Sequence, residues 1–439
     1  MDYFFEQMRA LLGGRYNDFI AAYETKPRHK ALRVNTAKLS VENFLALAGN
    51  GHALKLNPLC AQSFYTAVKP SLDPLYHAGL YYMQEPSASA AVEAFSPFIG
   101  RHVLDVCAAP GGKSTQVAAK MKGGVIFCND VDRKRVSALE ENIARLGIRN
   151  AVTTLASAKD YRNAGFDGYF DTLVVDAPCS GGGMMRYENV PYSAEIVAGC
   201  AARQREILDD ATELLSVGGY LLYSTCTFAP EEDEKTVEYI IEKGFEPVDT
   251  PLEAGEERGI GVPQARRIYP HNFDGEGHFF CILKKLENTN SPRALVPCAI
   301  KCARLKTEKV RVFGKSADAA VIGGIPTLVD LDTFELPESG LRYRTVGAPV
   351  FERDGRERAS YAYSHALSAD ELSEVPAVEL DEENAMRYIR GEQIFAAAQK
   401  GDVVVTHKGF ALGTGRCAPD GAGTTVVKNL YPKHLRINK

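Results

Sequence analysis

Two cysteines stand in contexts that suit nucleophilic chemistry. One is Cys179, in Asp176-Ala-Pro-Cys179-Ser-Gly, and the other is Cys226, in Ser224-Thr-Cys226-Thr. A thiolate is a strong nucleophile even when only a small fraction of the thiol is ionised. Attack on carbon 6 of an electron-poor pyrimidine would make carbon 5 carbanion-like, able to take a methyl group from a sulfonium. Asp176 could stabilise that adduct by hydrogen-bonding the ring edge. A redox pair is an alternative, but no Cys-x-x-Cys spacing supports it.

A glycine-containing loop could bind a nucleoside cofactor. The run Leu104–Thr115 reads as a strand, a turn around Gly111 and Gly112, and the start of a helix, so backbone N–H groups can approach a ligand closely. A phosphate-binding P-loop would need a further glycine at the position of Cys107, and the loop is too tight for a triphosphate. Asp130 ends the next apolar run, where a carboxylate can accept hydrogen bonds from ribose hydroxyls. S-adenosylmethionine fits this pattern.

The elements around these residues alternate in type. Short apolar runs predict strands, and segments with helical periodicity lie between and after them. Such alternation predicts an α/β, Rossmann-like, doubly wound parallel sheet that gathers ligands at the carboxyl ends of its strands, where both cysteines emerge. The predicted strands are Val103–Cys107, Val125–Asn129, Ala151–Leu155, Thr172–Asp176 and Tyr220–Ser224; the predicted helices are Gly112–Met121, Asp132–Leu146, Ala201–Leu215 and Pro230–Lys243.

Composition narrows the class of protein. The 439 residues carry 51 Lys and Arg against 56 Asp and Glu, a formal charge of −5, so nucleic-acid binding would have to rest on local patches. No apolar run approaches the ~20 residues that span a bilayer, and the N-terminus is too short and acidic for a secretory signal. The ten cysteines are scattered along a chain without a predicted secretory signal, so we expect them to be reduced thiols. We expect a cytoplasmic protein that does not enter the membrane.

The chain divides into four expected parts. They are a helical or mixed segment over 1–75, the catalytic domain over 76–286, an accessory domain over 293–375 and a small module over 380–439 that begins with a helix near 381–399. RNA binding by the first and last parts is what a family resemblance implies. Ser368 and Glu371 predict a capping box. Removing residues 380–439 should weaken RNA binding more than cofactor binding. Candidate phosphate contacts are Arg28–Arg33, Lys301–Lys315 and Lys428–Lys439. Cys298 and Cys302 have no partner pair, so no metal site is expected.

The motifs resemble a known family. Cys107-Ala-Ala-Pro-Gly-Gly-Lys113, Asp176-Ala-Pro-Cys179-Ser-Gly and Ser224-Thr-Cys226-Thr, in that order, are similar to the RNA cytosine-C5 methyltransferases of the Nop/Sun (Fmu) type. Flanking segments agree, among them Leu32-Arg33-Val34-Asn35-Thr36 and Gly275-Glu-Gly-His278-Phe-Phe280. The closing Lys428-Asn-Leu-Tyr-Pro432 resembles the C-terminal extension of the bacterial ribosomal-RNA branch, and the last domain resembles PUA-type RNA-binding modules.

The resemblance implies roles for single residues. Cys226 matches the nucleophile that attacks carbon 6, and Cys179 matches the residue that helps to release product; Asp176 would contact the base and Lys113 would lie in the catalytic pocket. The cofactor S-adenosylmethionine would contact Cys107, Ala108, Ala109, Pro110, Gly111, Gly112, Lys113, Asp130 and Asp176. The usual polar residue near the adenine is missing at Ser157, where Asp160 or backbone groups could substitute. Arg186 would contact a phosphate.

The expected substrate is ribosomal RNA, with the small-subunit (16S) RNA or the small subunit itself as the partner and a monomer as the active form. A transfer-RNA substrate is the alternative within the same class. A catalytically inactive RNA-binding factor for ribosome assembly is the alternative from another class. The expected catalytic residues are intact, which argues against an inactive factor because a protein that only binds RNA needs neither thiol. They are Cys226, Cys179, Asp176 and Lys113.

Overall fold

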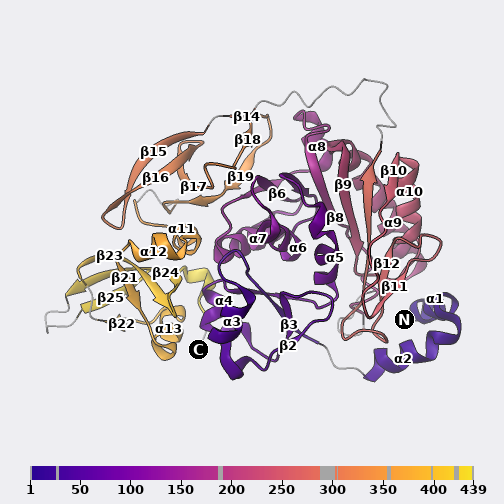
Figure 1. Cartoon of the computed structure of the whole chain (residues 1–439), viewed down its shortest axis with the longest axis horizontal. Coiled ribbons are helices and arrows are strands. Elements are labelled where there is room, and N and C mark those ends of the chain that lie inside the picture. The colour runs from indigo at the N-terminus through magenta and orange to yellow at the C-terminus, as the bar shows by residue number, and fades with distance from the viewer. Residues whose placement is uncertain are drawn as a thin grey trace.

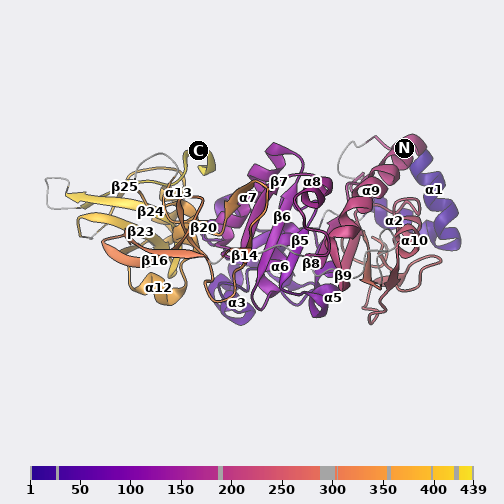
Figure 2. The same ribbon diagram turned by 90° about the horizontal axis from the view of Figure 1, so that it is seen from above.

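The molecule is elongated and built from three regions in a row. The computed structural model describes residues 2–25, 29–185, 191–286, 302–303, 305–352, 357–396, 399–419 and 425–437. A large central sheet occupies the middle (Figure 1). The first two helices lie at one end and the C-terminal sheet at the other, as both views show (Figures 1 and 2). Among the described residues, no helix is long and apolar enough to cross a membrane, and no group of three His, Cys, Asp or Glu could hold a metal ion. Cys298 lies outside the described residues.

The N-terminal segment is mixed rather than helical. Two helices are followed by a four-stranded antiparallel sheet in the order β2-β3-β1-β4. Because β4 pairs with β1, this sheet continues past residue 75 to Gln84. The elements are α1 (Asp2–Leu12), α2 (Tyr16–Thr25), β1 (Ala31–Val34), α3 (Val41–Ala48), β2 (Lys55–Leu56), β3 (Ser63–Tyr65), α4 (Pro74–His77) and β4 (Tyr81–Gln84).

The central sheet has the predicted doubly wound core. Its order is β11-β12-β13-β9-β8-β5-β6-β7-β19, and β9, β8, β5, β6 and β7 are parallel. From β5 the chain adds β6 and β7 on one side, and it then returns to add β8 and β9 on the other side. A ligand crevice is expected where the strand order reverses, between β5 and β8. The strands are β5 (His102–Asp105), β6 (Val125–Asp130), β7 (Ala151–Leu155), β8 (Phe170–Asp176), β9 (Leu215–Thr225), β10 (Phe245–Pro247), β11 (Glu256–Arg258), β12 (Arg266–Ile268) and β13 (His278–Lys285).

Helices cover both faces of this sheet, which explains its continuous apolar strands. Successive strand residues enter opposite cores: Val103 packs with α5, α6 and α7, whereas Leu104 packs with α8, α9 and α10. The helices are α5 (Ala88–Phe95), α6 (Gly112–Lys120), α7 (Arg133–Leu146), α8 (Ala158–Asn163), α9 (Ala194–Leu214) and α10 (Glu234–Glu242). The five predicted strands and four predicted helices of this domain are confirmed, with shifted ends.

One strand of the region after 300 extends the central sheet of the catalytic domain. β19 pairs antiparallel with β7 and so extends the central sheet, while Arg344 forms two hydrogen bonds of 2.8 and 3.0 Å to Glu140 on α7. Ser368 and Glu371 form the predicted capping box. The elements are β14 (Cys302–Ala303), β15 (Lys306–Val312), β16 (Lys315–Ile322), β17 (Ile325–Leu328), β18 (Leu336–Pro337), β19 (Tyr343–Val346), β20 (Ala348–Pro349), α11 (Tyr361–Ala366) and α12 (Ala369–Ser373).

The C-terminal sheet has the order β21-β23-β24-β25-β22. The expected helix over 381–399 is too long: α13 ends at Ile389 because Gly391 adopts φ +83°, after which the chain extends into β22. This sheet shares one hydrophobic core with the N-terminal sheet, so the two sheets pack against each other. The elements are β21 (Ala377–Glu379), α13 (Glu382–Ile389), β22 (Ile394–Phe395), β23 (Gly401–His407), β24 (Phe410–Pro419) and β25 (Thr425–Asn429).

Candidate active site

The glycine loop connects β5 to α6 at the crevice. Gly111 adopts φ +109°, and a Cβ there would lie 3.0 Å from the side chain of Leu139, so only glycine fits the turn. The amide of Ala108 donates to the carbonyl of Asn129 at 2.7 Å, and the Asn129 side chain donates to the carbonyl of Val106 at 3.0 Å. The loop is therefore fixed to the end of β6.

Arg33 supports the loop from the N-terminal sheet. Its guanidinium is buried and donates to the carbonyl of Gly112 at 2.6 Å, to the hydroxyl of Thr115 at 2.7 Å and to the side chain of Gln84. Burial lowers the pKa of Arg33 to about 10, which leaves it charged at neutral pH. The expectation that Arg33 contacts a phosphate is wrong, because the side chain faces the core. Arg28 lies outside the described residues.

Asp105 is a buried carboxyl beneath the loop that sequence reasoning missed. It accepts a hydrogen bond from Ser114 at 2.6 Å through Oδ2, while Oδ1 has no hydrogen-bond partner within the described chain. Burial raises the pKa of Asp105 to about 7. The available signal was its position: an acid at the end of a strand, directly before a glycine loop.

A cavity of about 380 Å³ opens beside the loop, at the ends of β5, β6 and β7. Cys107, Asp130 and Ser157 are among its lining residues. Asp130 is buried; its Oδ1 accepts from the amide of Asp132 at 3.0 Å, and its Oδ2 lies 3.2 Å from Arg135 without a hydrogen bond from any described residue. An unsatisfied carboxylate oxygen at this strand end suits the hydroxyls of a ribose.

Ser157 and Asp160 are the two residues expected near the adenine, at the end of this cavity next to β7. Only one of them lines the cavity. Ser157 lines the cavity, whereas the carboxylate of Asp160 accepts hydrogen bonds from the amide and hydroxyl of Ser157 at 2.8 Å each and completes the N-cap of α8. Asp160 does not line the cavity. It therefore does not replace the missing adenine contact, and the Ala156–Ala158 segment, which lines the cavity, offers backbone groups there.

A second cavity of about 280 Å³ adjoins the first. Both are lined by Cys107, Arg135 and Pro178, so a ligand in one can reach a ligand in the other. The second is also lined by Asp176, Ala177, Cys179, Ser180, Gly181, Met184 and Cys226. The structure thus brings both expected cysteines and Asp176 to one cavity, as the parallel strands β8 and β9 require.

The two thiols are in contact. Cys179 Sγ and Cys226 Sγ lie 3.2 Å apart, and both side chains are half-buried. The hydrogen bond to Cys226, together with burial, raises the pKa of Cys179 well above its ordinary value. Cys179 therefore stays protonated and can donate its S–H to the sulfur of Cys226. This arrangement suits Cys226 as the nucleophile and Cys179 as a proton donor.

Lys113 and Asp176 form an ion pair at the edge of this cavity. Lys113 Nζ lies 2.8 Å from Asp176 Oδ1, which also accepts from Ser224 Oγ at 2.8 Å. Burial raises the pKa of Asp176, but Lys113, His278 and the hydrogen bonds outweigh it, so the pKa is lowered and the carboxylate is ionised. Burial and the neighbouring Lys113 lower the pKa of His278 to about 3, so its imidazole is neutral. Lys113 is buried and does not line the cavity.

Glu232 joins the two cysteine loops, and no sequence motif marked it. Its carboxylate accepts from the amide of Ser180 at 2.9 Å, from the hydroxyl of Ser180 and from Gln204 at 3.0 Å. Ser180 in turn hydrogen-bonds Thr227 at 2.9 Å, next to Cys226. The buried carboxylate of Glu232 therefore fixes the position of the Cys179 loop relative to the Cys226 loop. Arg186, an expected phosphate contact after this loop, lies outside the described residues.

Family models match three stretches of the chain. They are described as 16S rRNA methyltransferase RsmB/F over residues 92–284, the N-terminal domain of 16S rRNA methyltransferase RsmF over 2–86, and the methyltransferase RsmF PUA domain over 375–437. The ribosomal RNA small subunit methyltransferase F of Vibrio vulnificus strain YJ016 is 30% identical over 476 residues, covering 99% of this chain and 97% of the relative. The chain belongs to this methyltransferase family. The relative from Klebsiella pneumoniae strain 342 is also 30% identical and covers 98% of this chain and 95% of its own.

Solved structures agree on the fold of this methyltransferase. A methyltransferase homologue from Pyrococcus horikoshii is 30% identical with a TM-score of 0.57, covering 64% of this chain and 94% of that one. NSun6 from the same organism, determined with SFG, has a TM-score of 0.59 at 22% identity, covering 66% and 99%. The predicted Rossmann-like methyltransferase fold with a C-terminal PUA domain is confirmed.

Proposed function

We propose that this methyltransferase methylates carbon 5 of a cytosine in 16S ribosomal RNA through a covalent adduct with Cys226. The observation that carries the proposal is the contact between Cys179 and Cys226, 3.2 Å apart, at the wall of a cavity that adjoins a nucleoside-sized one. The names of the relatives support 16S RNA as the substrate.

S-adenosylmethionine suits the larger cavity. Asp130 would accept from the ribose hydroxyls, and Cys107 to Lys113 would lie along the methionine part. SFG, an analogue of S-adenosylmethionine, accompanies the NSun6 structure of the same fold. When bound, the cofactor supplies a methyl group as an electrophile. In this proposal Asp176 contacts the target cytosine as well as the cofactor.

The reaction then follows from the positions of four side chains. The Cys226 sulfur attacks carbon 6, a sulfur–carbon bond forms, and the electrons of the carbon 5–carbon 6 double bond move to carbon 5. Asp176, held ionised by Lys113 at 2.8 Å, accepts from the ring edge and orients it. After carbon 5 is methylated, its proton leaves to a base, the double bond reforms and the sulfur–carbon bond breaks. Cys179 helps this release as a hydrogen-bond donor to the departing sulfur.

The domain division is also part of the proposal. We divide the chain as the sequence suggests, with 76–286 as the catalytic part, 293–375 and 380–439 as accessory parts and 1–75 as the first RNA-binding part. That first part is extended to Gln84, because β4 pairs with β1. We propose a monomer that works in the cytoplasm.

Labelled methyl transfer tests the substrate. The full chain is incubated with labelled S-adenosylmethionine and, separately, protein-free 16S RNA, small ribosomal subunits and transfer RNA from cells that lack the enzyme. Label in 5-methylcytosine of 16S RNA, naked or in the subunit, is the expected result. Label only in transfer RNA would overturn the ribosomal substrate, and no label in any RNA would favour the binding-factor alternative.

A further inference from the structure

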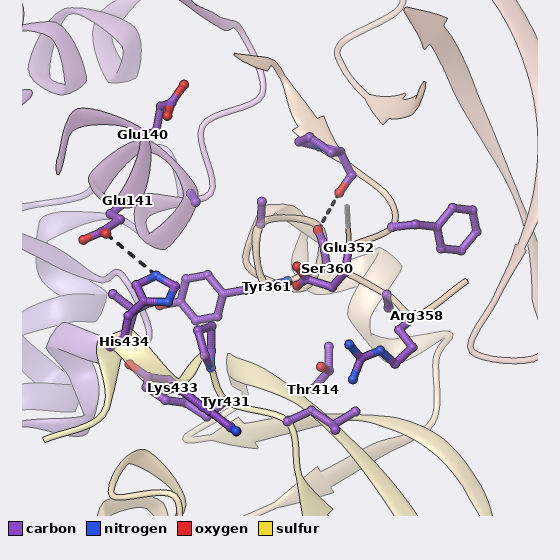
Figure 3. A pocket seen from close by; sticks show the side chains of 18 of the residues that line it. Glu140, Glu141, Glu352, Arg358, Ser360, Tyr361, Thr414, Tyr431, Lys433 and His434 are labelled. Carbon is purple, nitrogen blue, oxygen red and sulfur yellow. Dashed lines mark hydrogen bonds and ion pairs between the residues drawn. The ribbon is translucent and has the colours of Figure 1, made fainter. Parts of the chain in front are cut away.

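A cavity of about 770 Å³ lies apart from the two cavities of the active site and shares no lining residue with either. Three parts of the chain enclose it: α7 of the catalytic domain, the segment around Phe351 and Tyr361, and residues 428–436 after the C-terminal sheet. Figure 3 shows Glu140 and Glu141 on one side, Glu352 and Arg358 on another, and Tyr431 and Lys433 below. Its volume is within the range of specific ligand sites.

The charge that remains available in this cavity is positive. Lys428 and Lys433 are exposed, and neither forms a hydrogen bond or ion pair with another described residue. Two of the three lining acids, Glu140 and Glu352, accept hydrogen bonds within the protein. The cavity therefore offers two ammonium groups without a protein counter-ion, a suitable site for phosphate oxygens.

Each lining acid has a partner. Glu140 accepts two hydrogen bonds from Arg344 at 2.8 and 3.0 Å, and Glu141 lies 3.7 Å from His434. Glu352 accepts from the amide of Tyr361 at 3.0 Å. The contact of Glu141 is an ion pair only when the imidazole of His434 is protonated, so Lys428 and Lys433 outnumber the one lining carboxylate that accepts no hydrogen bond from a described residue.

The walls also suit a flat ring. Phe351, half-buried, is one lining residue of the cavity, and Pro432 and Thr414 are two others. An aromatic ring and ammonium groups on the walls of one cavity are the kinds of side chain with which single-stranded nucleic acid is bound, the base on the ring and the phosphate on the cations.

The helix α7 lies between this cavity and the active site. On one side, Asn142 donates to the carbonyl of Pro110 at 3.0 Å and Arg135 to that of Ala109 at 2.9 Å, both in the glycine loop. On the other side, Ser137 and Glu141 line the cavity. RNA held there would be fixed to the helix that backs the cofactor loop.

We propose that this cavity binds a nucleotide unit of the substrate RNA, its phosphate on Lys428 and Lys433 and its base against Phe351, at a distance from the methylated cytosine. The inference rests on the proposed function for its RNA substrate. It adds a docking site built jointly by the catalytic, middle and C-terminal parts, so RNA can bind productively only when these three parts are assembled.

The test compares two charge-matched double variants of the full chain. Lys428→Gln/Lys433→Gln removes the two ammonium groups, and Lys122→Gln/Lys235→Gln removes two exposed lysines elsewhere. Binding of protein-free 16S RNA is measured by filter retention at several salt concentrations. We expect the first variant to bind at least 5-fold more weakly, with the slope of log K against log salt reduced by about 1 to 2. The control should match the wild type in both.

Two further measurements separate binding from folding and chemistry. The first variant should raise the KM for RNA by the same factor as the dissociation constant, with kcat and the calorimetric affinity for S-adenosylmethionine unchanged. Phe351→Leu, which keeps an apolar side chain but removes the ring, should weaken RNA binding about 5-fold or more without changing the salt slope.

The outcomes distinguish this inference from the proposed function. If the wild type methylates RNA and the cavity variant binds RNA as the control does, with the same slope, the cavity is not a nucleotide site and the proposed function stands. If the wild type neither binds nor methylates any RNA, both fail together. Loss of cofactor affinity in the cavity variant would show a general structural defect and would also overturn the assigned role.

Discussion

The chemistry of single residues depends on the pair of thiols that closes one cavity. Cys179 has a raised pKa because of its hydrogen bond to Cys226 and its burial, so Cys179 keeps its proton and can donate it to the neighbouring sulfur. The sequence predicted both residues and their order of roles through the family resemblance, and the structure places them in contact. It did not predict Glu232, one of the four consecutive acids Glu231–Glu234, or Asp105, because neither has a distinctive spacing from another chemically active residue.

Cys179→Ala should trap a covalent protein–RNA adduct. Attack by Cys226 and methylation would proceed, but the sulfur would leave slowly without its hydrogen-bond donor. On a denaturing gel, Cys179→Ala incubated with 16S RNA and S-adenosylmethionine should give a slow-migrating band that is absent for Cys179→Ala/Cys226→Ala. Cys200→Ala, a change at a half-buried cysteine of α9, serves as the control and should turn over normally. A band that persists in the double variant would exclude Cys226 as the nucleophile.

Asp130→Asn should weaken the binding of S-adenosylmethionine about 10- to 100-fold, because hydrogen bonds to a charged acceptor contribute about 1.5–3 kcal/mol. Isothermal calorimetry measures the change. Asp132→Asn is the matched control, since Asp132 caps α7 on the same loop and asparagine caps a helix equally well. Equal affinities for the two variants would remove Asp130 from the ribose site.

At the scale of elements, the alternation of strands and helices predicted the sheet because strands buried on both faces read as apolar runs. The small sheet β2-β3-β1-β4 was missed: its strands are two to four residues long and pair across long loops, so no periodicity marks them. The pairing of β19 with β7 was missed for the same reason. Short strands are decided by tertiary contacts, which a local pattern does not contain.

Arg33→Met should loosen the connection between the N-terminal sheet and the glycine loop. The variant loses the hydrogen bonds to Gly112 and Thr115, and we expect the free energy of unfolding to fall by about 2–3 kcal/mol. Cofactor affinity should also fall, since Gly112 begins α6. Urea unfolding measures the stability and calorimetry measures the cofactor affinity. Arg311→Met, at an exposed position of β15, is the control. If stability falls without any change in cofactor affinity, Arg33 supports the fold alone.

At the scale of the whole molecule, the buried His77 makes the junction between the N-terminal and C-terminal sheets sensitive to acid. His77 lies next to Tyr431, with Nδ1 accepting from the Tyr431 hydroxyl at 3.0 Å and Nε2 donating to the carbonyl of Ser71 at 3.2 Å, an arrangement that requires a neutral ring. Burial lowers the pKa of His77 to about 4, and the nearby Arg145 acts in the same direction, opposed by Asp73 and the bond to Ser71.

Acid should therefore destabilise the protein in a defined range. The unfolded histidine takes up its proton near pH 6.5 and the folded one near 4, so the stabilisation is complete above about pH 6.5 and is lost as the pH falls towards 4, by at most about 3 kcal/mol. Urea unfolding of the wild type and of His77→Gln between pH 7.5 and 4.5 measures this. The variant should show a shallower dependence; parallel curves would assign the loss to other groups.

The C-terminal part is not the separable module that the sequence suggests. Leu380, Tyr388 and Tyr431 share one hydrophobic core with Leu32 and Tyr81 of the N-terminal sheet. Removing residues 380–439 would expose that core to water. It would also remove the hydroxyl that hydrogen-bonds His77 and the Lys408 ammonium that donates to the carbonyl of Leu47 at 3.0 Å. The earlier expectation, that RNA binding falls more than cofactor binding, is therefore replaced by a loss of both.

The truncated chain should unfold at a temperature at least 10 °C below that of the full chain, because losing one large buried aromatic side chain already costs about 3–5 kcal/mol. Differential scanning calorimetry, with S-adenosylmethionine titrated at 10 °C, measures stability and cofactor affinity together. A point variant such as Lys433→Gln, exposed and without a described partner, should keep both at the wild-type level and isolates RNA binding from folding. A soluble truncated chain with wild-type melting and cofactor affinity would instead show that the shared core contributes little, and that RNA binding can be removed as a unit.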